Sequence, residues 1–91
     1  MKQIRKHFHF MGRVQGVGFR YRAKYLAQCY AVTGWVRNEF DGSVTMELQG
    51  SAEEINLVLK GINRDSWIRI EWVDSSGIPL VEGEKGFRVY Y

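Results

Sequence analysis

Hydrophobic side chains along this chain switch repeatedly between a repeat of two residues and a helical repeat, and few folds are compatible with the order of these switches. The alternating His-Phe-His-Phe segment at residues 7–10 predicts a strand that ends at Gly12. From Phe19 onward, hydrophobic residues recur at i, i+4, i+7, i+8 and i+11, which predicts a helix that runs to about Ala31. The chain therefore begins with a strand followed by a helix.

The remaining residues repeat this pattern and add a hairpin. Ser51 and Glu54 have the spacing of a helix capping box, and helical spacing continues from there to Ile62. Gly61 weakens the prediction of the last helical turn. The other predicted elements are strands at Thr33–Asn38, Ser43–Gln49 and Trp67–Val73, a final strand through Phe87, Val89 and Tyr91, a tight hairpin loop containing Asp41-Gly42, and a polar connection from Ser75 to Lys85.

This order of elements predicts a ferredoxin-like fold. Strand, helix, strand, strand, helix and strand, with one more short strand, form the split βαβ pattern of an α+β (α/β sandwich) domain. We predict two helices on one face of an antiparallel sheet whose other face is open to solvent. Ile68, Ile70 and Trp72 are expected to share one side of their strand, and Trp35, Trp67 and Trp72 to be packing residues. The length of 91 residues predicts one domain over residues 1–91.

Several features predict a cytoplasmic protein. No apolar run approaches the length of a membrane span. The basic start, residues 1–6, is followed by alternating residues and not by the continuous apolar stretch of a secretory signal. Cys29 is the only cysteine, so an internal disulfide is impossible.

Charge is distributed unevenly between the two parts of the chain. Residues 1–38 contain eight lysines and arginines and no aspartate or glutamate, whereas residues 39–91 contain five basic and ten acidic residues. A cationic first part attracts anions. Four of its cations are expected to be ordinary solvated surface charges: Lys2, Arg5, Lys6 and Lys24.

A glycine-rich loop joins the first predicted strand to the first predicted helix. Gly16 and Gly18 allow backbone conformations in which successive amide N–H groups point at one anion, and the start of the helix adds its own unpaired N–H donors. Arg20 lies in the first helical turn, where a cation is unfavourable for the helix itself but well placed to hold two phosphate oxygens. The residues predicted to bind phosphate are Arg13, Val14, Gln15, Gly16, Val17, Gly18, Phe19 and Arg20.

Glycine-rich turns are common, so this prediction depends on the combination of glycines, Arg20 and the missing acidic residues. The loop lacks the Gly-Lys-Ser/Thr of a Walker A motif and the G-x-G-x-x-G of a dinucleotide site. Cys29 does not have the Cys-x5-Arg spacing of cysteine phosphatases, and His7 and His9 are two potential zinc ligands without a third. We therefore predict no metal, no cofactor and water as the nucleophile.

Water must be oriented for attack, and an asparagine side chain can both donate and accept hydrogen bonds without titrating. Asn38, at the end of the second predicted strand, is the candidate. Taken alone, Asn38 is better explained as a turn residue at a strand end. A carboxylate leaving group would depart without a general acid or a metal, which matches the residues available.

Two segments resemble the signatures of the acylphosphatase family. Residues 12–20, Gly-Arg-Val-Gln-Gly-Val-Gly-Phe-Arg, are similar at every fixed position to the family's G-x-V-Q-G-V-x-F-R signature. Residues 34–44, followed by Gly50, resemble its second signature. The resemblance covers essentially the whole chain and implies a single acylphosphatase-like domain that hydrolyses the carboxyl-phosphate bond of small acyl phosphates. It implies that Arg20 is the substrate-binding arginine and Asn38 the water-orienting asparagine.

Two other functions remain open at this point. Residues 85–91 resemble part of the RNP1 motif of RNA-binding ferredoxin-like domains, but that motif belongs on the third strand, where residues 43–49 contain no aromatic residue. A regulatory phosphate-binding domain without catalysis would need Arg20 but not Asn38. We expect a monomer whose partner is a small-molecule acyl phosphate, with no nucleic-acid or membrane partner.

Overall fold

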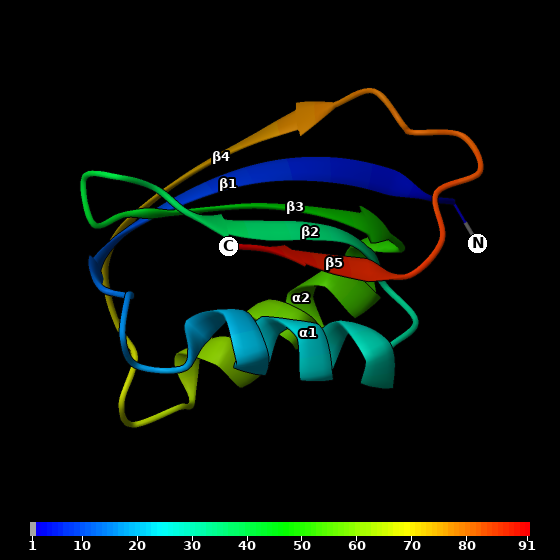
Figure 1. Cartoon of the computed structure of the whole chain (residues 1–91). Coiled ribbons are helices and arrows are strands. Elements are labelled where there is room, and N and C mark those ends of the chain that lie inside the picture. The colour runs from blue at the N-terminus through cyan, green and yellow to red at the C-terminus, as the bar shows by residue number, and fades with distance from the viewer. Residues whose placement is uncertain (1) are drawn as a thin grey trace.

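The computed structural model, which describes residues 2–91, confirms the predicted ferredoxin-like α+β fold (Figure 1). Its elements are β1 (Ile4–Arg13), α1 (Phe19–Cys29), β2 (Thr33–Asn38), β3 (Val44–Gly50), α2 (Ala52–Asn63), β4 (Arg69–Ile78) and β5 (Phe87–Tyr90). Within residues 2–91, no helix is both long and apolar enough to cross a membrane.

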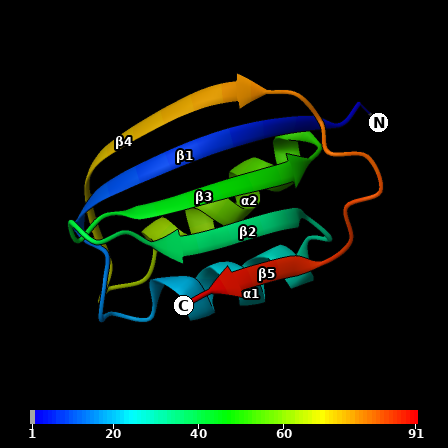
Figure 2. The same cartoon turned by 45° about the horizontal axis from the view of Figure 1, so that its top comes forward.

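The five strands form one sheet in the order β4-β1-β3-β2-β5, and both helices lie on the same face of it (Figures 1 and 2). The pairs within β4-β1-β3-β2 are antiparallel, as predicted, but β5 pairs with β2 in parallel. The sheet is therefore mixed. β4 and β5 are opposite edges of the sheet. The connection between them therefore crosses from one edge to the other, and it passes near the N-terminus of the chain, as Figure 1 shows.

The hydrophobic core fills the space between the sheet and the two helices. Its most buried members come from every layer: Phe8, Phe10, Phe19, Ala23, Val36, Val44, Met46, Leu48, Ile55, Val58 and Ile62. α2 continues through Gly61. A side chain at this position would collide with Leu26 of α1, because an added Cβ would lie only 2.7 Å from the Leu26 methyl carbons. Close approach of the two helices explains a glycine that helix propensity disfavours.

The capping box at the start of α2 is confirmed. Ser51 Oγ accepts a hydrogen bond from the Glu54 N–H at 3.1 Å, and the Ser51 N–H donates to Glu54 Oε1 at 3.3 Å. α1, in contrast, ends at Cys29, two residues before its predicted end. Ala31 has a left-handed backbone (φ 55°), and Val32 N–H bonds to the Ala27 carbonyl, so the chain turns away there toward β2.

β4 differs most from its predicted limits. It begins at Arg69 and extends to Ile78, so residues 75–78, predicted as connection, pair with β1. Ser75, Ser76 and Gly77 lie exposed at the sheet edge, which explains why this segment carries no hydrophobic alternation.

The prediction that Ile68, Ile70 and Trp72 share one side of their strand is wrong for Trp72. Pairing with β1 passes from Met11–Trp72 to Gly12–Ile70, and this β-bulge turns Trp72 to the opposite face. Trp72 and Trp67 are largely exposed, so they are not packing residues.

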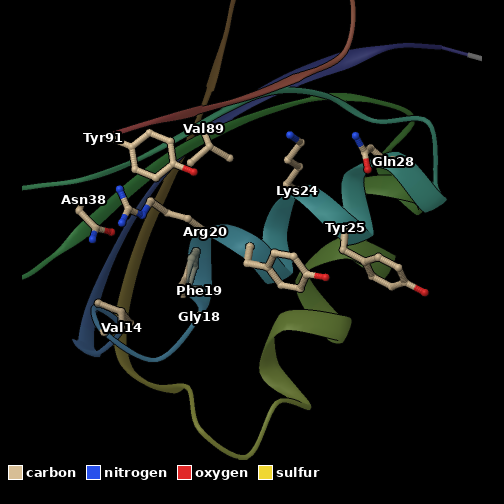
Figure 3. Close-up of a pocket in the computed structure, with 12 residues that line it drawn as sticks. Val14, Gly18, Phe19, Arg20, Lys24, Tyr25, Gln28, Asn38, Val89 and Tyr91 are labelled. Atoms are coloured by element: carbon tan, nitrogen blue, oxygen red, sulfur yellow. The ribbon is translucent and has the colours of Figure 1, made fainter.

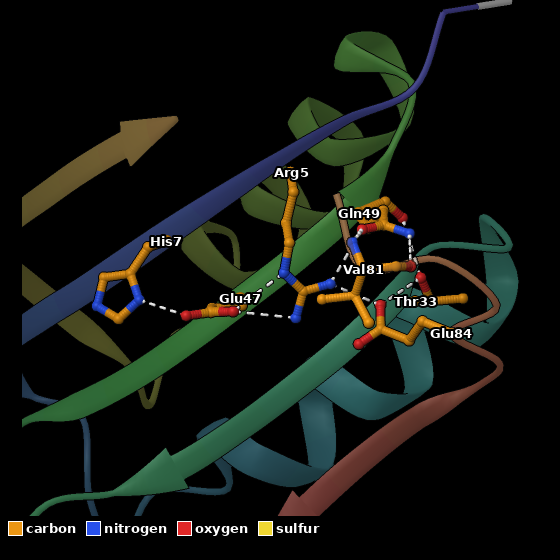
Figure 4. Close-up of polar contacts among 7 residues, drawn as sticks. All are labelled: Arg5, His7, Thr33, Glu47, Gln49, Val81 and Glu84. Carbon is orange, nitrogen blue, oxygen red and sulfur yellow. Dashed lines mark hydrogen bonds and ion pairs between the residues drawn. The ribbon is translucent and has the colours of Figure 1, made fainter. Parts of the chain in front are cut away.

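Arg5 is the clearest departure from the predicted surface charges. Its side chain is buried on the sheet face opposite the helices, between two glutamates (Figure 4). Arg5 Nε donates to Glu47 Oε1 at 3.0 Å, and Arg5 Nη1 donates to Glu84 Oε1 at 2.7 Å. Burial opposes the charge on Arg5, but the hydrogen bonds with Glu84 and Glu47 outweigh it and raise the pKa of the guanidinium. The open face therefore carries a buried ion-pair network.

The same network fastens the connection between β4 and β5. Thr33 Oγ1 donates to Glu84 Oε1 at 2.7 Å. The side-chain amide of Gln49 forms two hydrogen bonds with the backbone of Val81. Its Oε1 accepts from the Val81 N–H at 2.8 Å, and its Nε2 donates to the Val81 carbonyl at 3.0 Å (Figure 4). These bonds hold residues 81–84 against the sheet and lead the chain directly into β5.

Candidate active site

A cavity of about 390 Å³ lies where the loop before α1, the end of β2 and the end of β5 meet (Figure 3). Arg20 and Asn38, which are far apart in sequence, line it together. Two cationic side chains and no aspartate or glutamate are among its lining residues: Val14, Gly16, Gly18, Phe19, Arg20, Tyr21, Lys24, Tyr25, Gln28, Asn38, Val89 and Tyr91. Its electrostatic character therefore favours an anion.

The loop conformation requires its glycines. Gly16 and Gly18 have φ values of 71° and 82°, in the left-handed region that other residues rarely adopt. Gly18 is the N-cap residue of α1, and its carbonyl accepts from the Arg22 N–H at 2.9 Å, which begins the helix. No side chain caps this end, and no acidic residue lies in the first turn. The positive end of the α1 dipole thus faces the cavity without local compensation.

Gln15 fixes the loop to the hairpin that carries Asn38. Its Nε2 donates to the carbonyls of Glu39 at 2.6 Å and Ser43 at 2.7 Å. Both acceptors belong to the turn between β2 and β3, immediately after Asn38. The side chain of Gln15 therefore sets the position of the glycine loop relative to Asn38.

Arg20 is oriented by the end of β5. Its Nη1 donates to the Tyr90 carbonyl at 3.0 Å, and its guanidinium lies over the Tyr91 ring, 4.7 Å from the ring centre. Figure 3 shows the guanidinium between Tyr91 and Asn38. A single carbonyl uses one of the five N–H donors of an arginine, so most donors stay available to a bound anion.

Asn38 has an amide oxygen that is buried and has no hydrogen-bond partner among residues 2–91. Such an atom is unusual, because buried acceptors are nearly always paired. Glu39 follows directly, but its carboxylate accepts from Arg37 Nε at 3.0 Å. Hydrogen bonds from Thr45 and then from Arg37 lower the pKa of Glu39. No residue that the structure describes therefore competes for the amide oxygen of Asn38, which lines the cavity.

The fold brings five of the eight residues predicted to bind phosphate to the cavity, and the side chains of the other three lie elsewhere. Arg13 lines a separate surface depression with Trp67 and Glu71. Val17 packs against the hydrophobic core, and Gln15 bonds the hairpin turn. A contribution of their backbone N–H groups stays a prediction. Val14 and Phe19 reach the cavity but are fully buried, so they shape its wall.

Sequence reasoning missed a second part of the cavity wall. Lys24 and Gln28 of α1 line it, as do Val89 and Tyr91 at the other end of the chain. Lys24 follows Arg20 by four residues, which places both on one helix face, and this spacing was a detectable signal. Nothing local in the sequence indicates that β5 lies beside α1. Among residues 2–91, no group of three or more His, Cys, Asp or Glu side chains is placed to hold a metal ion.

Comparison with known proteins identifies the family. The acylphosphatase family model matches residues 6–89. An acylphosphatase from Clostridium acetobutylicum is 40% identical over 82 residues, which cover 89% of this chain and 90% of that protein. One from Clostridium perfringens is 39% identical over 88 residues, covering 96% and 99%. The crystal structure of acylphosphatase from Bacillus subtilis matches with a TM-score of 0.87 at 26% identity, covering 97% of this chain and 99% of that one. On the sequence, the fold and the shared length, this chain belongs to the acylphosphatase family.

Proposed function

We propose that this protein hydrolyses the carboxyl-phosphate bond of small acyl phosphates, with water as the nucleophile and without a metal ion. The observation that carries the proposal is the meeting of Arg20, Asn38 and the glycine loop in one cavity that no aspartate or glutamate lines. Membership of the acylphosphatase family supports the same reaction class.

In this proposal, the phosphate of the substrate lies at the start of α1. N–H groups of the loop and the guanidinium of Arg20 hold its oxygens and stabilise the charge that develops during transfer. The bond between phosphorus and the acyl oxygen breaks, and the carboxylate leaves with the bonding electrons. A carboxylate is a stable anion at neutral pH, so its departure needs no proton donor.

Asn38 is proposed to position the water. Its unpaired Oδ1 accepts a hydrogen bond from the water and directs a lone pair at phosphorus, in line with the leaving carboxylate. The water oxygen becomes the fourth oxygen of inorganic phosphate, and the protons of the water end on phosphate and solvent. Asn38 and Arg20 are the proposed catalytic residues.

The first test is hydrolysis of benzoyl phosphate by the purified protein, followed as phosphate release with and without EDTA. We expect turnover that EDTA does not change, because no step uses a metal. Binding of inorganic phosphate without turnover would instead indicate a regulatory phosphate-binding domain. Salt-sensitive binding of oligonucleotides without turnover would indicate an RNA-binding module. Turnover abolished by EDTA and restored by a metal would contradict the metal-free mechanism.

Arg20→Lys is expected to lower kcat/KM by about tenfold or more, the range for losing a charge-assisted hydrogen bond. Lysine keeps the charge but cannot present a planar pair of donors to two phosphate oxygens. The matched control is Arg22→Lys, on the same helix, where the guanidinium faces Asp65 at 4.0 Å and does not line the cavity. Steady-state kinetics with benzoyl phosphate measure kcat/KM of both variants. An Arg20→Lys enzyme with the kcat/KM of the wild type would contradict the proposal that Arg20 binds two phosphate oxygens.

The remaining expectations from the sequence stay predictions. They are a monomer, a cytoplasmic location and a single domain over residues 1–91. Gel filtration with light scattering measures the first of these directly.

A further inference from the structure

The cavity continues past Arg20 along α1, farther than a phosphate group needs. Arg20, Lys24 and Gln28 follow one another at intervals of four residues, so they share one face of the helix. Figure 3 shows Lys24 and Gln28 projecting from α1 on the side of Arg20. Val89 and Tyr91 line the same cavity from the other side, where β5 contacts α1. The extension is therefore a groove between a helix and a strand edge.

Lys24 is the charged residue of this groove, and it has no ion-pair partner among residues 2–91. Two other cations in the same part of the chain have acidic partners. Arg22 faces Asp65, and Arg37 bonds Glu39. No aspartate or glutamate side chain lines the groove, so the ammonium group of Lys24 adds to the positive potential of Arg20.

The direction of the reaction places the acyl group in this groove. Asn38 lies on one side of Arg20 and Lys24 on the other, as Figure 3 shows. In an in-line displacement, the leaving group departs opposite to the attacking water. If Asn38 holds the water, the acyl group must point away from β2 and along α1 toward Lys24.

We propose that Lys24, with Gln28 beside it, forms an acyl-group subsite that favours acyl phosphates bearing a second anionic group. The inference rests on the proposed function. Positions four residues apart on a helix are separated by about 6 Å, so one small molecule can span Arg20 and Lys24. The preferred substrate class is thus the monophosphate of a dicarboxylic acid or an acyl phosphate that carries a second phosphate.

The kinetic test compares benzoyl phosphate with 4-carboxybenzoyl phosphate, which differ only in the second anionic group. Wild-type protein is expected to prefer the carboxylated substrate by about fivefold in kcat/KM, the upper range for an ion pair of an exposed side chain. The preference should appear mainly in KM and weaken with salt. In Lys24→Gln, the ratio of the two kcat/KM values should fall to about one. Lys60→Gln, on α2 and outside the cavity, should keep the wild-type ratio.

A binding measurement separates this inference from the proposed function. Calorimetry compares benzylphosphonate with (4-carboxybenzyl)phosphonate, neither of which can be hydrolysed, in the wild-type protein and Lys24→Gln. Selective binding that depends on Lys24, in a protein that hydrolyses neither acyl phosphate, would support the subsite and contradict the enzyme. Hydrolysis of both substrates with equal kcat/KM, and equal binding of both phosphonates, would overturn the subsite and leave the enzyme standing.

Discussion

Asn38→Ala is expected to lower kcat by about a hundredfold or more, the usual effect of losing one preorganised hydrogen-bonding group that acts on the transition state. KM should change little, because in the proposed mechanism Arg20 and the loop hold the phosphate. The physical reason is that Asn38 lines the cavity and its Oδ1 has no partner among residues 2–91, so the proposed mechanism assigns this oxygen to the attacking water. Initial rates with benzoyl phosphate across a range of concentrations measure both constants.

Two further variants show whether the effect belongs to the amide. Asn38→Asp keeps the shape and the oxygen acceptor but adds a negative charge beside the phosphate, so it should also be strongly impaired. Asn56→Ala, at an exposed position of α2, should behave as the wild type. An Asn38→Ala protein with a kcat within twofold of the wild type would remove Asn38 from the mechanism.

Arg5→Met is expected to reduce the free energy of unfolding by about 3 kcal/mol, near the lower end of the range for breaking a buried ion pair. The variant leaves the carboxylates of Glu47 and Glu84 without the guanidinium between them (Figure 4). Their side chains are 17% and 15% exposed, so water compensates only part of the loss. Urea denaturation followed by tryptophan fluorescence gives the difference.

The pH dependence of stability provides a second readout of the same contact. Burial alone would raise the pKa of Glu47, but hydrogen bonds with His7 and Arg5 outweigh it and lower the pKa below its ordinary value of 4.5. A carboxyl group with a lowered pKa in the folded state stabilises the protein above its unfolded pKa. That contribution disappears as the pH falls through the folded pKa. Wild type and Arg5→Met should therefore converge in stability in acid.

Suitable controls isolate the ion pair from other effects of the substitution. Arg88→Met removes an exposed arginine of β5 and should cost less than about 0.5 kcal/mol. Adding Glu47→Gln and Glu84→Gln to Arg5→Met should recover part of the lost stability, because no unpaired charge then remains. Equal stabilities of Arg5→Met and Arg88→Met would contradict the proposed importance of the network.

The order of the elements could be predicted because each signal is local. The alternating residues of β1, the helical spacing of α1 and the capping box of α2 each lie within a short stretch of chain. The extension of β4 could not, since Ser75 and Ser76 are strand residues only through pairing with β1. The face of Trp72 depends on a bulge that alternation cannot reveal.

The same distinction applies to the site. The glycine loop, Arg20 and Asn38 stand in recognisable segments, and the fold brings them to one cavity. The burial of Arg5 was not detectable, because its partners Glu47 and Glu84 lie far along the chain. Tyr91 reaches Arg20 only because β5 adds to β2 in parallel. Local sequence patterns do not show which distant segments of the chain contact one another.

β5, the strand that orients Arg20, leaves the ribosome after the other described elements. Both helices and four strands precede β5, and synthesis from the N-terminus delivers them first. A nascent chain can therefore pack most of its interior while the guanidinium of Arg20 still lacks the Tyr90 carbonyl. Collapse of the interior and completion of the Arg20 contact can therefore be separate steps in the synthesis of this chain.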